Sequence, residues 1–134
     1  MLMKPGRRDG GEVGWVLVGA GGGNMGCVPP VPGFLTGLRE ICDSAGALLI
    51  FDEVSIGWRL HFGGAHLKFG VDPDIAVFAK ALGSGHPMAA VIGTPAAMDG
   101  AHTSFISSTY WTESVGPVAA LATLRKMQTV DVPA

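Results

Sequence analysis

The sequence predicts an α/β protein with a mostly parallel sheet and helices on both of its faces. Residues 13–18 and 47–51 are short, continuous apolar runs of the kind found in strands that are covered on both sides. Between them, residues 34–44 have apolar side chains at helical spacing. A strand, helix, strand unit of this kind usually pairs its two strands in parallel through a right-handed crossover.

The expected helix over residues 34–44 places its apolar side chains on one face and ends at Gly46, a residue type favoured just past a helix. That apolar face consists of Phe34, Leu35, Leu38, Ile41 and Cys42.

Further elements are expected on either side of this unit. Residues 1–12 are polar and glycine-containing and are predicted to be irregular, and residues 74–79 and 88–93 are predicted to be buried strands. Residues 96–100 are compatible with a short helix.

The C-terminal part is predicted to end in an alanine-rich helix over residues 116–127. Its expected apolar face comprises Val118, Leu121, Ala122 and Leu124. Residues 104–112, which are rich in hydroxyl and aromatic side chains, are expected to touch a ligand or another subunit.

Composition indicates the interior of a larger body or, alternatively, a small obligate oligomer. Charged residues make up 15% of the 134 residues, against about 25% in typical soluble domains. The chain has 21 glycines and a mean hydropathy of +0.39. Its net charge of −2 gives no basic surface for nucleic acid.

No apolar stretch reaches the roughly 18 residues of a membrane span. A cytoplasmic protein with no membrane or nucleic-acid partner is therefore expected. Cys27 and Cys42 lack metal-site spacing and are expected to be free thiols, and no metal site is predicted.

Gly21, Gly23 and Gly26 match the G-x-G-x-x-G pattern of dinucleotide-binding loops. That pattern needs a helix to begin at once, so that its N-terminus can receive a pyrophosphate. Pro29 and Pro30 follow instead and impose extended or turn backbone. A flexible loop at the edge of a site is favoured, and a dinucleotide-binding domain is the less favoured alternative.

Two ionisable residues stand at the ends of neighbouring apolar runs: Asp52 follows residues 47–51, and Lys80 follows residues 74–79. In an open α/β sheet, ligands bind at the carboxyl ends of the strands. A partly desolvated lysine can form a Schiff base with a carbonyl, and a carboxylate can keep a pyridinium nitrogen protonated. The pair fits pyridoxal phosphate chemistry, although each residue alone is equally typical of an ordinary loop.

Motifs along most of the chain resemble class III aminotransferases, and the glutamate-1-semialdehyde 2,1-aminomutase group in particular. They run in the family's order and spacing from about Val13. They are Gly23-Asn24-Met25-Gly26-Cys27-Val28-Pro29-Pro30, Leu48-Leu49-Ile50-Phe51-Asp52-Glu53-Val54 with Gly57 and Arg59, Phe69-Gly70-Val71 with Pro73-Asp74-Ile75, and Lys80-Ala81-Leu82-Gly83 with Gly85 and Pro87.

The resemblance implies the central part of the large domain of a fold-type-I pyridoxal-phosphate-dependent transferase. Residues 13–134 would be a partial cofactor-binding large domain, with its N-terminal part and the C-terminal small domain absent. The implied enzyme is a homodimer with its site at the subunit interface. It would move an amino group from a small-molecule donor to a carbonyl acceptor, as a transferase, or act as an isomerase of the mutase type.

The resemblance also implies roles for single residues. Lys80 would form the Schiff base and move protons, Asp52 would contact the pyridine nitrogen, and Val54 would pack on the ring. Thr112, with Thr109 as the alternative, would reach the cofactor phosphate from the partner subunit. Glu53 is either a hydrogen-bond support for Asp52 or merely exposed.

Departures from the family pattern leave a second reading open. Gly19-Ala20 stands where the family usually has Glu-Pro, and Ser84 and His86 replace commoner residues in the lysine turn. By the resemblance, the family's first phosphate-binding loop would lie upstream of the motifs found here. The alternative function is a non-catalytic truncated remnant or association module.

Overall fold

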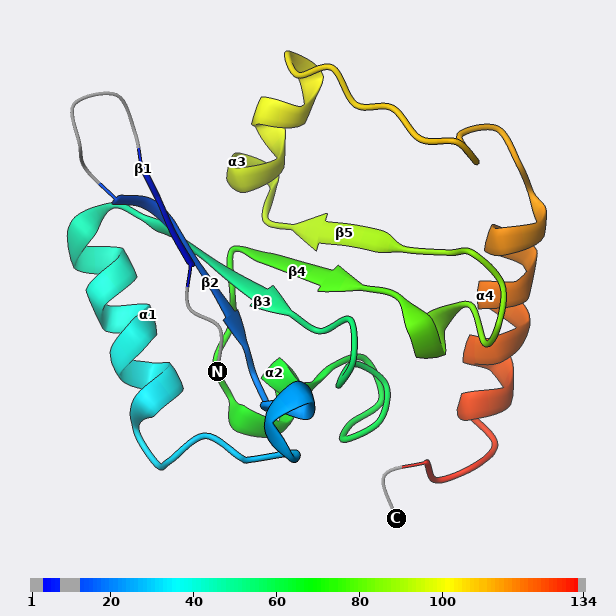
Figure 1. Cartoon of the computed structure of the whole chain (residues 1–134), viewed down its shortest axis with the longest axis horizontal. Coiled ribbons are helices and arrows are strands. Elements are labelled where there is room, and N and C mark those ends of the chain that lie inside the picture. The colour runs from blue at the N-terminus through cyan, green and yellow to red at the C-terminus, as the bar shows by residue number, and fades with distance from the viewer. Residues whose placement is uncertain (1–3, 8–12, 133–134) are drawn as a thin grey trace.

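The computed structural model describes residues 4–7 and 13–132, which form a five-stranded mixed sheet with strand order β1-β2-β3-β4-β5 (Figure 1). The central pairings β2·β3 and β3·β4 are parallel, and the edge pairings β1·β2 and β4·β5 are antiparallel. The strands are β1 (Lys4–Arg7), β2 (Val13–Gly19), β3 (Leu48–Asp52), β4 (Ile75–Phe78) and β5 (Ala90–Gly93).

In the described part of the chain, four α-helices and three 3₁₀ turns connect or flank the strands. They are η1 (Gly23–Met25), α1 (Phe34–Ala45), α2 (Ala65–Phe69), η2 (Lys80–Leu82), α3 (Pro95–Met98), η3 (Asp99–His102) and α4 (Val115–Met127). None of the helices in the described residues is long and apolar enough to cross a bilayer. Helix α2 lies in a stretch for which no element was predicted.

Strands β2 and β3 with helix α1 between them confirm the predicted strand, helix, strand unit. The helix buries Leu35, Leu38 and Cys42 against the sheet, and burial raises the pKa of the Cys42 thiol. Gly46 ends it with a φ of +61° and donates its N–H to the carbonyls of Cys42 and Asp43. The prediction that Ile41 belongs to the buried face is wrong, since its side chain is 62% exposed.

The two faces of the central sheet differ in burial. Side chains on one face of β2 and β3, including Val16, Val18, Leu49 and Phe51, pack in one core cluster with α1. On the opposite face the side chains of Trp15 and Ile50 are only half-buried. In the described residues, the core therefore lies between α1 and one face of the sheet.

A second, smaller cluster joins β4 to helix α4, with Phe78 and Leu82 packed against Ala120. The extent of α4 was predicted correctly, but its buried face only in part: Leu124 packs against this cluster as expected. Gly116 and Ala120 are buried, whereas Val118 and Leu121 are more than half exposed. At Gly116 the helix lies close to the segment that precedes β5, since a Cβ on Gly116 would lie 3.0 Å from the Pro87 carbonyl oxygen.

The two edge strands differ from the sequence prediction. Lys4–Arg7 pairs with β2, so irregular structure is wrong for these four residues. Edge pairing uses backbone groups and needs no apolar pattern, and an edge strand tolerates Pro5. Strand β5 is not buried as expected: Val91 and Ile92 are 54% and 58% exposed, because no described strand lies beyond it.

The start of β4 is tied to β3 by Asp74. Its Oδ2 accepts hydrogen bonds from the Leu49 amide at 2.7 Å and from Arg39 at 2.8 Å. Partial burial works against the charge of Arg39, but hydrogen bonds to Asp74 and Asp43 keep the pKa of Arg39 above its usual value. These contacts link α1, β3 and β4 at the end of the sheet opposite to Asp52.

Glu53 anchors the loop that follows β3 and is 1% exposed, so the alternative that it is merely exposed is wrong. Its carboxylate accepts the amide hydrogens of Ala65 and His66 at 2.8 and 2.9 Å and lies 2.9 Å from His66 Nδ1. It thereby satisfies two N–H groups at the start of α2, which no helical carbonyl can reach. Its own N–H donates to the Val77 carbonyl at 2.9 Å.

Replacing Glu53 by Gln is expected to lower the free energy of unfolding by about 1–3 kcal/mol, since an amide cannot accept all of these hydrogen bonds. Urea unfolding measures the change. Glu40→Gln, on the exposed side of α1, is the matched control and should change stability by less than about 0.5 kcal/mol. Equal effects of the two variants would contradict the anchoring role.

Gly57 is expected to tolerate no side chain, because a Cβ there would lie 2.7 Å from the Glu53 carbonyl oxygen and 2.8 Å from Phe78 Cδ1. Gly57→Ala should lower the free energy of unfolding by about 1–3 kcal/mol. Gly37 in α1 has open space at its Cβ position, so Gly37→Ala should raise stability by about 0.5–1 kcal/mol. Thermal unfolding of both variants tests the difference, and a stable Gly57→Ala protein would refute the expected overlap.

Candidate active site

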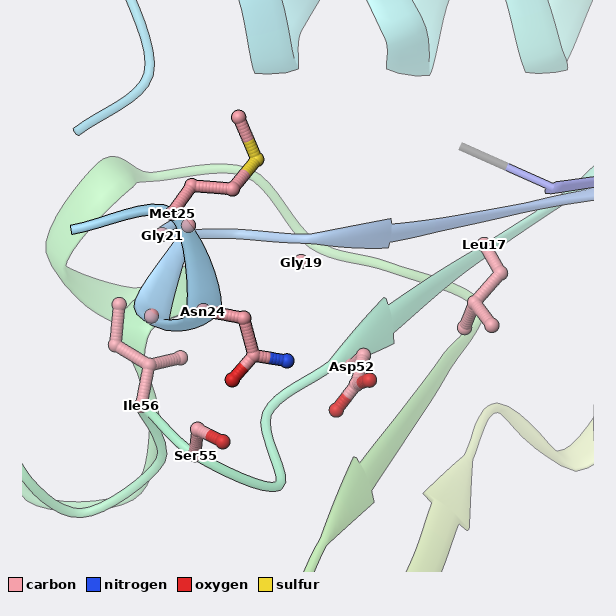
Figure 2. A pocket seen from close by; sticks show the side chains of 10 residues that line it. Leu17, Gly19, Gly21, Asn24, Met25, Asp52, Ser55 and Ile56 are labelled. Carbon is pink, nitrogen blue, oxygen red and sulfur yellow. The ribbon is translucent and has the colours of Figure 1, made fainter. Parts of the chain in front are cut away.

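A pocket of about 160 Å³ lies at the carboxyl ends of β2 and β3 (Figure 2). Figure 2 shows Asn24 of η1 extending into the same space as Asp52, at the end of β3, and Ser55, in the loop that follows β3. The lining residues are Leu17, Gly19, Gly21, Gly22, Gly23, Asn24, Met25, Asp52, Ser55 and Ile56. The position agrees with the expectation that ligands bind where parallel strands end.

Asp52 is the last residue of β3, and its exposed side chain lines this pocket. The parallel register pairs it with Gly19 of β2 and Val77 of β4. Its Oδ1 accepts the Val54 N–H at 3.0 Å, which holds the carboxylate against the following turn. Among the described residues no donor is hydrogen-bonded to Oδ2, so this oxygen is available to a ligand.

Lys80 stands two residues beyond β4 and begins the turn η2. Its φ of +48° is in the left-handed region, which is uncommon for a residue with a side chain. The Lys80 carbonyl accepts the N–H groups of Gly83 and Ser84 at 3.2 and 3.1 Å, and the Lys80 amine donates a hydrogen bond to Ser55 Oγ. The amine thus reaches a side chain that lines the Asp52 pocket.

The glycine-rich segment, residues 19–26, forms the wall of the pocket opposite to Asp52 and Ser55. It turns through η1 and folds back as an isolated bridge between Gly22 and Val28, and no α-helix begins there. This loop gives no helix N-terminus for a pyrophosphate. A Cβ on Gly21 would overlap the terminal methyl group of Ile56, so the loop lies close to the turn after β3 at this position.

Gly19 lies at the departure from the family's Glu-Pro pair. It lines the pocket beside Asp52, and a Cβ built on it meets no atom within 4 Å. The pocket therefore has room for a side chain at this position.

A larger pocket of about 680 Å³ adjoins the first and shares Gly21, Gly23, Asn24, Ser55 and Ile56 with it. Arg59 and Lys68 add two exposed cationic side chains to its wall, and the exposed Cys27 also lines it. In the described ranges, 4–7 and 13–132, no three metal-binding side chains gather closely enough to hold a metal ion.

The other residues singled out in the sequence are not brought to the pocket. Val54 is half-buried in the turn after β3, and Thr112 and Thr109 are exposed in the segment before α4. His86 lies in the lysine turn, with Nδ1 3.3 Å from the Gly83 carbonyl oxygen. Ser55 and Asn24 were missed, and the only signal for Ser55 was its place three residues after Asp52.

Comparison with known proteins identifies relatives over most of this chain. The family model described as aminotransferase class-III matches residues 3–133. Glutamate-1-semialdehyde 2,1-aminomutase of Nitratidesulfovibrio vulgaris is 52% identical over 84 residues, which are 63% of this chain and 20% of the relative. The chain thus spans about a fifth of the length of this curated relative.

Solved structures of similar proteins have the same fold. An amine transaminase from an uncultivated Pseudomonas species, in its PLP-bound internal aldimine form, superimposes with a TM-score of 0.80 at 30% identity, covering 87% of this chain and 28% of the other. An omega-transaminase from Sphaerobacter thermophilus gives 0.75 at 35% identity, covering 83% and 26%. Together with the strand-end site, the match over residues 3–133 places this chain in the class III aminotransferase family.

Proposed function

We propose that this chain supplies the central cofactor-binding part of a pyridoxal-phosphate-dependent aminotransferase or aminomutase. The observation that carries the proposal is the hydrogen bond from the Lys80 amine to Ser55, which lines the same pocket as Asp52. An amine and a carboxylate from adjacent parallel strands are thereby presented to one space. The PLP-bound transaminase with the same fold supports the assignment.

The residues present fit this cofactor. The pocket offers a carboxylate oxygen with no described donor, suited to a protonated pyridine nitrogen, and an amine suited to an aldehyde. Pyridoxal phosphate, when bound, would supply an electron sink for charge that develops on the substrate. The glycine-rich wall lets the backbone approach a flat ring closely.

In the proposed site, the Lys80 amine would hold the cofactor by its aldehyde and, when not bonded to it, would take and return a proton as general acid and base. Asp52 stabilises the positive charge of the pyridine nitrogen through a charge-assisted hydrogen bond. Val54 would pack on the ring; it is half-buried in the turn between Asp52 and Ser55, both of which line the pocket.

We further propose a homodimer in which Thr112, or Thr109, contacts the cofactor phosphate of the partner subunit. The supporting observation is the exposure of the surrounding aromatic segment: Phe105 is 96% and Trp111 66% exposed. Exposed aromatic side chains are typical of surfaces that bind another protein. The substrates would be a small-molecule amino donor and a carbonyl acceptor, as for an aminotransferase, or a single compound in a mutase reaction.

The same exposed segment would also serve a non-catalytic association module, which is the competing function. That function needs no lysine-bound cofactor. Cofactor attachment to Lys80 therefore separates the two functions.

Lys80→Ala is expected to abolish covalent attachment of pyridoxal phosphate, because the variant lacks the amine that attacks the aldehyde. The full chain is incubated with cofactor, reduced with borohydride and digested, and the modified peptide is identified by mass spectrometry. Lys126→Ala, in the last turn of α4, is the matched control and should retain the modification. Unmodified Lys80 in the parent protein would favour the association module.

Asp52→Asn is expected to weaken cofactor binding by about tenfold or more, because the amide loses the charge-assisted part of the hydrogen bond to the ring nitrogen. Titration of the cofactor's absorbance measures the dissociation constant. Asp99→Asn, on the exposed turn after α3, provides the control and should bind as the parent does. Equal affinity of Asp52→Asn and the parent would remove Asp52 from the site.

A further inference from the structure

The backbone of Lys80 is fixed more firmly than a strand end requires. Ala79 is extended, with φ of −160°, and the chain then turns sharply to the left-handed φ of +48° at Lys80. Hydrogen bonds from Gly83 and Ser84 to the Lys80 carbonyl hold this turn. The starting point of the lysine side chain is therefore set, but its four-carbon stem remains free to rotate.

A free lysine stem samples many rotamers, and restricting it costs up to about 2 kcal/mol of conformational entropy. A particular position of Nζ therefore needs a partner. Within residues 4–7 and 13–132, no carboxylate lies within ion-pair distance of Nζ, and the described partner of the amine is the Ser55 hydroxyl.

Ser55 is itself held by the turn between β3 and the following loop. Within this turn Asp52 Oδ1 accepts the Val54 N–H at 3.0 Å, and the Glu53 carbonyl accepts the Gly57 N–H at 2.7 Å. The buried Glu53 side chain fixes the turn to α2. Ser55 thus has a rigid backbone support and faces the pocket.

A hydroxyl is suited to an amine that changes its protonation state. It accepts a hydrogen bond from an ammonium ion and can donate one to the lone pair of a neutral amine. A carboxylate can only accept, so it would hold the charged form selectively. Ser55 can therefore hold the Lys80 amine both before and after it gives up a proton.

We propose that Ser55 is a positioning residue that keeps the Lys80 amine beside the Asp52 pocket whenever this amine is not bonded to the cofactor. Its significance for catalysis rests on the proposed function, since an amine that leaves and re-forms a covalent bond must stay within reach. The contact itself exists without a cofactor, and it can be tested without one.

The test compares Ser55→Ala with Ser55→Thr in the full, cofactor-free chain. The proteins are treated with a limiting amount of acetic anhydride at several pH values, and mass spectrometry measures acetylation of Lys80 relative to Lys126. Ser55→Ala should raise the relative labelling of Lys80 about fivefold, the factor that corresponds to one ordinary hydrogen bond. Ser55→Thr keeps the hydroxyl and should label as the parent does.

Two results would overturn the proposal: labelling of Ser55→Ala that equals the parent at every pH, or labelling of Ser55→Thr that equals Ser55→Ala. Circular dichroism spectra identical to the parent's establish that each variant is folded. Failure of the proposed function would appear separately, as absent borohydride trapping in the parent, because the acetylation experiment contains no cofactor.

Discussion

The parallel pairing of β3 with β4 is the interaction on which the candidate site depends. Its register sets Asp52 beside Val77, and the hydrogen bond from the Glu53 amide to the Val77 carbonyl continues the pairing by one residue. At the other end, the Asp74 carboxylate accepts the Leu49 amide and fixes where β4 starts. A shift by one residue would turn every side chain to the opposite face. This register therefore decides whether Asp52 lines the same pocket as Ser55, the hydrogen-bond partner of the Lys80 amine.

The turn after β3 directs the side chains that follow the strand either into the pocket or into the protein interior. Asp52 and Glu53 are neighbours, but they point into different surroundings, one into the pocket and one into the protein interior. The buried Glu53 carboxylate accepts hydrogen bonds from N–H groups at the start of α2. The exposed Asp52 carboxylate has one oxygen without a described donor, and this oxygen is available to a ligand. In the proposed enzyme, Glu53 thus anchors the loop, and the adjacent Asp52 faces the cofactor.

Much of the fold could be predicted from the sequence, because the spacing of apolar residues indicates helices and strands, and glycines often mark where they end. Strands β2, β3 and β4 and helices α1 and α4 were expected at nearly their observed positions. Burial was harder to predict: Ile41, Val91 and Val118 are apolar but exposed, since exposure depends on which surfaces neighbouring elements cover. Strand β1 was missed because its pairing uses backbone groups alone.

For the candidate site, the sequence motifs predicted Asp52 and Lys80, while Ser55 became visible only through its contact with the lysine amine. A serine near a turn has no distinctive pattern, so geometry alone could identify it. A crystal structure of the full-length protein with pyridoxal phosphate would test the account most directly. We expect electron density continuous from Lys80 Nζ to the cofactor, with the ring nitrogen beside Asp52; a cofactor bound elsewhere, or with its nitrogen turned away from Asp52, would contradict the account.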